Sequence, residues 1–195
     1  MSKRIITISR EFGSGGRTIG RQVAEKLGIA FYDKELIEEG AEKSGLSEKF
    51  IEEQGEYSPA KNRFAYAFVG RSIGGMSVDD YLWSVQRKII LEIAEKESCV
   101  IVGRCADYIL REREDVLNVF IHADKEKRAE RIVKLYGESN KEPKKRLMEK
   151  DKKRAINYKY YTEQDWGMAK NYHLALDSGA FGIEKCVELI TELAK

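Results

Sequence analysis

Short apolar runs alternate along the chain with segments in which apolar residues recur at helical spacing. The runs predict strands at Ile5–Ile8, Ile29–Asp33, Cys99–Val102, Val116–Ile121 and His173–Leu176. The helical spacing predicts helices over 18–27, 34–43, 48–54, 78–96 and 183–193, and a charge-rich helical region over 125–160. Apolar strands that alternate with helices predict an α/β fold, with a five-stranded parallel sheet between two helical layers.

Polar and glycine residues follow several of these strands. A glycine-rich segment follows the first strand, and Asp33, Gly103-Arg104 and Asp177-Ser178 lie at or just beyond the ends of three others. Ligands of open parallel sheets bind outside the carboxyl ends of the strands. We therefore expect these residues to gather around one binding site.

The segment after the first strand, Arg10 to Thr18, has the architecture of a phosphate cradle. Its glycines allow successive backbone N–H groups to converge on an anion, and the following helix, for which Thr18 is the expected cap, adds its positive end. Against the P-loop pattern G-x-x-x-x-G-K-[ST], Gly15 takes the second glycine, Gly16 stands at the lysine and Arg10 replaces the first glycine. We expect donor phosphates on Gly13, Ser14, Gly15, Gly16, Arg17 and Thr18.

A dinucleotide-binding site is an alternative interpretation of the same glycines. Gly13-x-Gly15-x-x-Thr18 is one residue from G-x-G-x-x-G, and Asp33 lies 20 residues after Gly13, where an acid would hold a ribose. Four residues separate the strand from Gly13, however, whereas the dinucleotide turn is tight. The arginine-rich segment later in the chain is also not needed for hydride transfer.

Composition and charge limit which classes of protein this chain can belong to. A chain of 195 residues with 42% hydrophobic content is expected to form a single domain. The net charge is +2, but residues 124–159 hold 14 Lys/Arg against 7 Asp/Glu, which favours an anionic ligand near this region. We expect a cytoplasmic protein with no membrane or nucleic-acid partner, since no signal peptide, membrane span or nucleic-acid module is visible. Three widely spaced cysteines indicate neither a zinc site nor a disulfide framework.

Several of these motifs, in their order, resemble the cytidylate kinase-like branch of the P-loop nucleoside monophosphate kinases. The resemblance runs nearly from end to end. It is carried by Ile5-Thr7-Ile8 with Gly13–Thr18, Tyr32-Asp33, Val102-Gly103-Arg104, Val119–Ala123 with Arg128–Arg131, Asp151-Lys152-Lys153-Arg154 and Leu176-Asp177-Ser178.

The resemblance implies a three-layer P-loop NTPase fold with a helical lid at about residues 136–161 and an acceptor-binding insertion at 34–80. It implies transfer of the ATP γ-phosphoryl group, with Mg²⁺, to a small acceptor, a nucleoside monophosphate such as CMP. The expected catalytic residues are Arg17, Arg131, Arg154 and Asp33, and Thr18 is the expected metal ligand. The acceptor is expected to contact Asp33, Arg104, Asp151 and Arg154.

The chain also departs from the family pattern. The Walker lysine is Gly16, no acid precedes Gly103, and Cys105 stands where the family has an aspartate, the nearest acid being Asp107. Arg17 is the first candidate to replace the charge of the lysine and Arg10 is the second. A regulatory nucleotide-binding protein without turnover is therefore the alternative function, and the sequence leaves the oligomeric state open.

Overall fold

The computed structural model describes residues 4–33, 42 and 77–195. The helices expected over 34–43 and 48–54 lie outside these residues, apart from Glu42, as does nearly all of the expected acceptor-binding insertion. Five parallel strands form one sheet in the order β2-β3-β1-β4-β5. They are β1 (Ile5–Arg10), β2 (Ala30–Tyr32), β3 (Cys99–Val102), β4 (Val116–His122) and β5 (Leu174–Asp177). The five-stranded parallel sheet expected from the sequence is confirmed.

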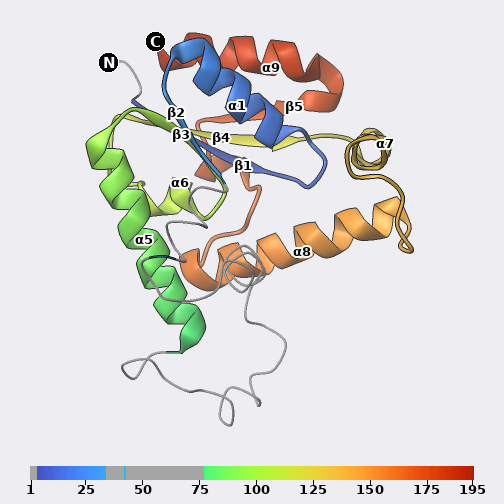
Figure 1. Cartoon of the computed structure of the whole chain (residues 1–195), viewed down its shortest axis with the longest axis horizontal. Coiled ribbons are helices and arrows are strands. Elements are labelled where there is room, and N and C mark those ends of the chain that lie inside the picture. The colour runs from blue at the N-terminus through green and yellow to red at the C-terminus, as the bar shows by residue number, and fades with distance from the viewer. Residues whose placement is uncertain (1–3, 34–41, 43–76) are drawn as a thin grey trace.

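Helices cover both faces of this sheet (Figure 1). One layer holds α1 (Gly16–Leu27) and α9 (Ser178–Ala194), and the other holds α5 (Val78–Lys96) and α6 (Ala106–Ile109). The pleat of β1 divides the core, because Ile6 and Ile8 pack with the α1–α9 layer and Ile5 packs with the α5–α6 layer. The three-layer P-loop fold is thereby confirmed.

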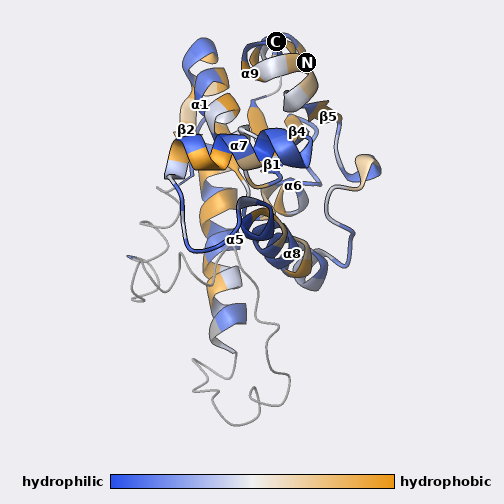
Figure 2. Ribbon diagram, turned by 90° about the vertical axis from the view of Figure 1, so that its right-hand side faces the viewer, coloured by the Kyte–Doolittle hydropathy of each residue, from blue (hydrophilic) through white to orange (hydrophobic). Residues whose placement is uncertain are grey.

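The charge-rich region after β4 forms two helices. They are α7 (Lys125–Tyr136) and α8 (Pro143–Thr162), and a short 3-10 turn, η1 (Ala169–Asn171), precedes β5. Gly137, at φ 72°, ends α7. Figure 2 shows α8 mainly in hydrophilic colours, and its buried side chains include Arg154, Asn157 and Thr162. Polar contacts therefore contribute much of the packing of α8.

Two helix starts differ from the sequence-based expectation. The prediction that Thr18 caps α1 is wrong, because the helix begins at Gly16 after Gly15 in the left-handed conformation, and Thr18 is an exposed residue of the first turn. The last helix begins at Ser178 instead of 183, because the Asp177 carboxylate accepts hydrogen bonds from two backbone N–H groups there. A break at Gly182 (φ 80°) separates this first turn from the rest of α9.

Candidate functional site

The glycine loop between β1 and α1 lies against α7 and α9. Gly13 and Gly15 have φ angles of 79° and 83°, which residues other than glycine rarely adopt. A Cβ atom on Gly13 would also lie 2.8 Å from Ile132 Cγ2, and one on Gly15 would collide with Ile183 of α9. Both glycines are therefore required by backbone conformation and by packing.

Three consecutive carbonyl groups of this loop accept hydrogen bonds from side chains of α7 and α9. The pairs are Arg128 Nη1 to Phe12 O (3.1 Å), Arg131 Nη1 to Gly13 O (2.9 Å) and Ser178 Oγ to Ser14 O. In a trans peptide the N–H of the next residue points opposite to the carbonyl. The N–H groups of Gly13, Ser14 and Gly15 are therefore directed away from these donors, although Ser14 N donates to Glu11 O. This orientation suits a phosphate cradle.

The side chain of Arg10 occupies the space above Gly16, the position of the Walker lysine. A Cβ atom on Gly16 would lie 2.6 Å from Arg10 Cβ and 2.9 Å from Arg10 Cγ. At the other end of the side chain, a Cβ atom on Gly103 would collide with Arg10 Nη1. Arg10 therefore extends from the start of α1 to the end of β3, crossing two glycines on the way.

A polar pocket opens where Arg10 ends. Three arginines line it, and two of them, Arg104 and Arg154, are each only 8% exposed. Within the described part of the chain, Arg104 Nη1 is buried and has no hydrogen-bond acceptor. Three cationic side chains around one pocket, two of them buried, are suited to an anionic ligand. The full lining is Ser9, Arg10, Gly103, Arg104, Cys105, Arg154, Asn157, Tyr158 and Trp166.

The backbone after β3 is strained where it directs Arg104 to this pocket. Gly103, Arg104 and Cys105 have φ angles of 76°, 60° and 53°. A left-handed conformation costs a non-glycine residue about 1–2 kcal/mol. The carbonyl of Arg104 accepts a hydrogen bond from Gln86 Nε2 (3.2 Å), which ties the strained turn to α5. Such strain often marks a functional segment.

Arg17 and Asp33 form an ion pair beside the loop. The Nε atom of Arg17 donates to Asp33 Oδ2, the Arg17 side chain is 45% exposed, and the Asp33 side chain is 10% exposed. The structure therefore brings two of the expected catalytic residues together. Thr18, the expected metal ligand, is exposed one residue further along α1.

Arg154 and Asp151 connect α8 to the glycine loop. Arg154 lines the pocket and donates from Nη1 to the carbonyl oxygen of Arg10 (3.1 Å). Asp151 accepts from the backbone N–H of Phe12 (2.7 Å). Arg131, also expected to be catalytic, contacts the loop through the Gly13 carbonyl, and burial lowers its pKa. Of these three residues, Arg154 alone lines the described pocket.

Sequence reasoning missed the structural importance of Arg128. This side chain is buried and donates to Asp151 (2.6 Å) and to the Phe12 carbonyl, and its Nε lies 3.3 Å from Glu11 Oε2. It joins α7, α8 and the glycine loop. The sequence signals were its place in the Arg128–Arg131 motif and near the start of a basic amphipathic helix, and neither separates a buried arginine from an exposed one.

Asp107 is a second residue whose importance the sequence did not reveal. It is 3% exposed, and its Oδ2 accepts a hydrogen bond from the hydroxyl of Tyr158 (2.7 Å). Burial raises the pKa of Asp107 from the usual 3.8 to about 6, although the Tyr158 hydrogen bond acts in the opposite direction. Because Tyr158 lines the arginine pocket, the hydrogen bond from Tyr158 to Asp107 holds one of the lining side chains in place.

The described residues fit phosphate groups better than they fit a metal held by protein alone. Nowhere among residues 4–33, 42 and 77–195 do three His, Cys, Asp or Glu side chains gather in a metal-binding arrangement. Mg²⁺ commonly keeps several waters and binds through substrate phosphates. Thr18 and Asp33, at the start of α1 and after β2, are the side chains that would contribute here. In the same part of the chain no helix meets the length and apolarity required to cross a membrane.

Comparisons with known proteins agree with this architecture. The profile described as "Cytidylate kinase-like family" matches residues 5–180. The chain is 30% identical over 191 residues to a protein named cytidylate kinase from Archaeoglobus fulgidus, with 95% of this chain and 91% of that one covered.

Two solved structures illustrate the fold. An uncharacterized protein from Eubacterium ventriosum has a TM-score of 0.74 and 28% identity, with 97% of both chains covered. Shikimate kinase from Bacteroides thetaiotaomicron has a TM-score of 0.56 and 18% identity, also with 97% of both chains covered, and supports the P-loop kinase fold. On the match to residues 5–180 and the archaeal relative, this chain belongs to the cytidylate kinase-like family.

Proposed function

We propose that this protein transfers the γ-phosphoryl group of ATP to a nucleoside monophosphate, with CMP as the first acceptor to test. The observation that carries the proposal is the junction of the glycine loop with a pocket lined by Arg10, Arg104 and Arg154. Phosphoryl transfer depends on positioning and on neutralising negative charge, and this junction provides groups for both.

The donor phosphates belong on the glycine loop in this proposal. The loop directs backbone N–H groups away from α7 and α9, and the positive end of α1 lies at Gly16. Mg²⁺, when bound, would neutralise charge on the phosphates, with Thr18 as a protein ligand. Arg17 and Asp33 lie at the start of α1 and at the end of β2, where an acceptor could meet the donor.

The acceptor phosphate belongs against Arg104 and Arg154. Both side chains are buried, and a planar guanidinium can donate two parallel hydrogen bonds to phosphate oxygens. Arg104 has a donor atom without an acceptor among the described residues, which an incoming phosphate would satisfy. Asp151 would support this arrangement by holding α8 against the loop. CMP is chosen because the archaeal relative is named cytidylate kinase.

The test is release of ADP from ATP–Mg²⁺ in the presence of each common nucleoside monophosphate in turn. We expect ADP release that depends on one pyrimidine nucleotide and falls at least about tenfold in Arg104→Ala, because a charge-assisted hydrogen bond contributes about 1.5–3 kcal/mol. Arg111→Ala is the matched control, since Arg111 lies on the Tyr108 ring outside the pocket lining.

A regulatory nucleotide-binding protein is the second candidate. It is favoured by two observations, the glycine at the Walker lysine position and Val102 in place of an acid before Gly103. Tight binding of ATP without transfer to any nucleoside monophosphate would favour this candidate and contradict the proposed kinase activity.

A further inference from the structure

We propose that the indole ring of Trp166 stacks on the base of the acceptor nucleotide while Arg104 and Arg154 hold the phosphate of that nucleotide. The inference rests on the proposed function for the identity of the ligand, a nucleoside monophosphate. It assigns to Trp166 the part of the acceptor that distinguishes a nucleotide from phosphate or from a sugar phosphate. Trp166 would thus determine specificity, and the two arginines would supply affinity for any phosphate.

The first argument is the chemistry of the pocket wall. Trp166 lines the same pocket as Arg104 and Arg154, and it is partly exposed, whereas the other aromatic residue of the lining, Tyr158, is only 3% exposed. The indole therefore adds a flat apolar surface, within reach of a ligand, to a pocket that is otherwise cationic and polar. A nucleotide has the matching combination, since it joins an anionic phosphate to a flat aromatic base.

The second argument is that no ring is stacked on this indole within the described part of the chain. Phe120 of β4 is the one aromatic side chain there that contacts Trp166, with ring centres 5.4 Å apart and ring planes at 82°. Trp83 differs, because it is stacked on Tyr161 with ring centres 4.3 Å apart and planes at 7°. Stacking by Trp83 already contributes to the packing of α5 on α8, whereas Trp166 can stack on a ligand.

The third argument is the support of the segment that carries Trp166 from α8 to β5. The two residues before it are both held by hydrogen bonds. Gln164 Oε1 accepts from the hydroxyl of Tyr158 (3.3 Å), and the carbonyl oxygen of Asp165 accepts from Asn171 Nδ2 (2.9 Å). A side chain on a supported segment loses less conformational entropy when it contacts a ligand, so more of the stacking energy is available for binding.

The experiment measures three kinds of probe by titration calorimetry: the four common ribonucleoside monophosphates, ribose 5-phosphate and inorganic phosphate. For Trp166→Ala we expect the affinity for the nucleotide that the parent binds most tightly to fall about 5- to 100-fold, the range for loss of one base–aromatic stack. The affinities for ribose 5-phosphate and for inorganic phosphate should equal those of the parent, because Arg104 and Arg154 are unchanged. Retained phosphate binding also shows that the pocket of this variant is folded.

Further variants separate the flat ring from its apolar bulk. Trp166→Phe keeps an aromatic plane and should keep most of the nucleotide affinity, whereas Trp166→Leu is apolar without a plane and should lose as much as Trp166→Ala. Trp83→Phe is the matched control, a tryptophan outside the pocket lining, and should bind every probe like the parent. Arg104→Ala should weaken the binding of all three kinds of probe, because the phosphate is common to them.

Each outcome has a defined meaning. Unchanged nucleotide affinity in Trp166→Ala, or an equal loss for ribose 5-phosphate, overturns the stacking role even if the protein is an active kinase. If Trp166→Ala does not fold, equal nucleotide affinities of Trp166→Phe and Trp166→Leu overturn it. The expected pattern in a protein without phosphoryl transfer supports Trp166 and contradicts the proposed kinase activity. A parent protein that binds phosphate but no nucleoside monophosphate contradicts both.

Discussion

The glycines of this site are explained by the side chains that pack against them, two of which lie far away in the sequence. Gly13 is constrained by Ile132, Gly15 by Ile183, and Gly16 by Arg10. The sequence located the glycine loop, because the spacing of its glycines is a local signal. It did not predict the path of the Arg10 side chain, because this path depends on which strand lies next to β1, which no local pattern records. The burial of Arg128 and Asp107 was missed for the same reason.

Replacement of Gly15 by alanine tests this view of the loop. The new methyl group would collide with Ile183, and the positive φ is itself unfavourable, so we expect the free energy of unfolding to fall by about 2–4 kcal/mol. The double variant Gly15→Ala/Ile183→Ala should lose less stability than the two single changes added together. Urea unfolding monitored by circular dichroism measures all four proteins, and strict additivity would contradict the contact.

At the scale of elements, the basic helices α7 and α8 are held to the glycine loop mainly by charged side chains. Arg128 contacts an acid on each side of it, and Asp151 contacts the loop backbone. The stacked rings of Trp83 and Tyr161, 4.3 Å apart, join α8 to α5 at its other end. The sequence predicted a charge-rich helical region here, and the lid expected at about 136–161 remains a prediction about motion.

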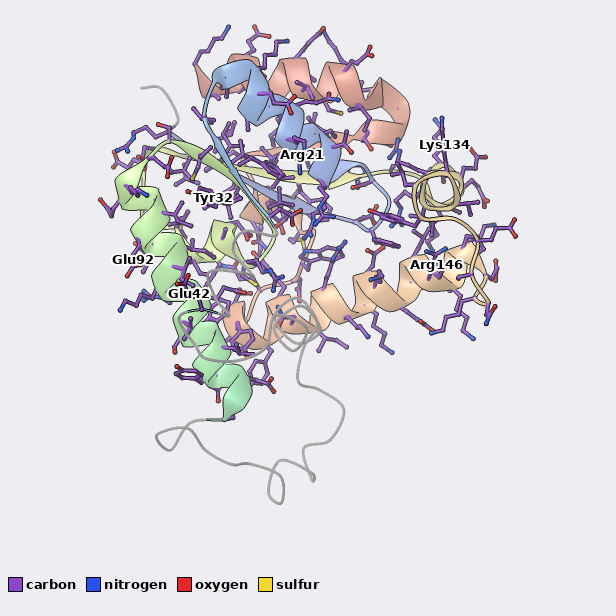
Figure 3. The ribbon with its side chains drawn as sticks, viewed as in Figure 1. Arg21, Tyr32, Glu42, Glu92, Lys134 and Arg146 are labelled. Carbon is purple, nitrogen blue, oxygen red and sulfur yellow. The ribbon has the colours of Figure 1, made fainter. Side chains whose placement is uncertain are left out.

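Arg128→Ala should lower the free energy of unfolding by about 2–3 kcal/mol. The change leaves Asp151 and Glu11 without the buried Arg128 guanidinium. This loss of stability is smaller than the loss on breaking a fully buried ion pair, because both carboxylates are partly exposed. Lys134→Ala is the control, since Lys134 points outward from the same helix (Figure 3) and should change stability by less than about 0.5 kcal/mol. Equal stability of the two variants would contradict the role assigned to Arg128.

The raised pKa of the buried Asp107 carboxyl group predicts that part of the free energy of unfolding decreases as the pH rises. Its pKa is raised to about 6 in the folded protein, mainly by burial, so between about pH 4 and 6 the folded chain binds more protons than the unfolded chain. The contribution of this group to stability therefore falls as the pH rises through this window, by on the order of 3 kcal/mol, and is constant above it.

The comparison of the parent with Asp107→Asn isolates this contribution. Asparagine can still accept the Tyr158 hydrogen bond but does not ionise, and subtraction cancels the carboxylates common to both proteins. The stability of the parent relative to the variant should decrease from pH 4 to pH 6 in urea unfolding. A difference that is independent of pH would mean that the buried carboxyl group does not titrate in this window.

At the scale of the whole molecule, the sequence predicted the fold well. Apolar strands and helical spacing are repeated signals, and α5 at Val78–Lys96 has the expected bounds. The family match to residues 5–180 and the parallel sheet agree with that prediction. Side-chain packing at the ends of three strands was harder to predict, since it depends on the order β2-β3-β1-β4-β5 rather than on any one segment.

Nucleotide binding should stabilise the whole domain, because the glycine loop contacts both α7 and α9. At 100 times its dissociation constant, ATP would add about 2.7 kcal/mol, which raises the melting temperature of a chain of this size by about 5–10 °C. Differential scanning calorimetry with ATP–Mg²⁺ measures the shift, and adenosine, which lacks phosphates, should give a much smaller one. Equal shifts for the two ligands would contradict phosphate recognition by the loop.

The position of Trp166 in the lining of the arginine pocket has an optical consequence. The chain has two tryptophans, and the other, Trp83, is stacked on Tyr161 at the contact between α5 and α8. Replacing Trp83 by phenylalanine would leave a single indole, which lies edge-on to Phe120 beside the buried guanidinium groups. Its fluorescence emission would then respond to charge entering that pocket, so an anion could be followed into this site in real time without an attached dye.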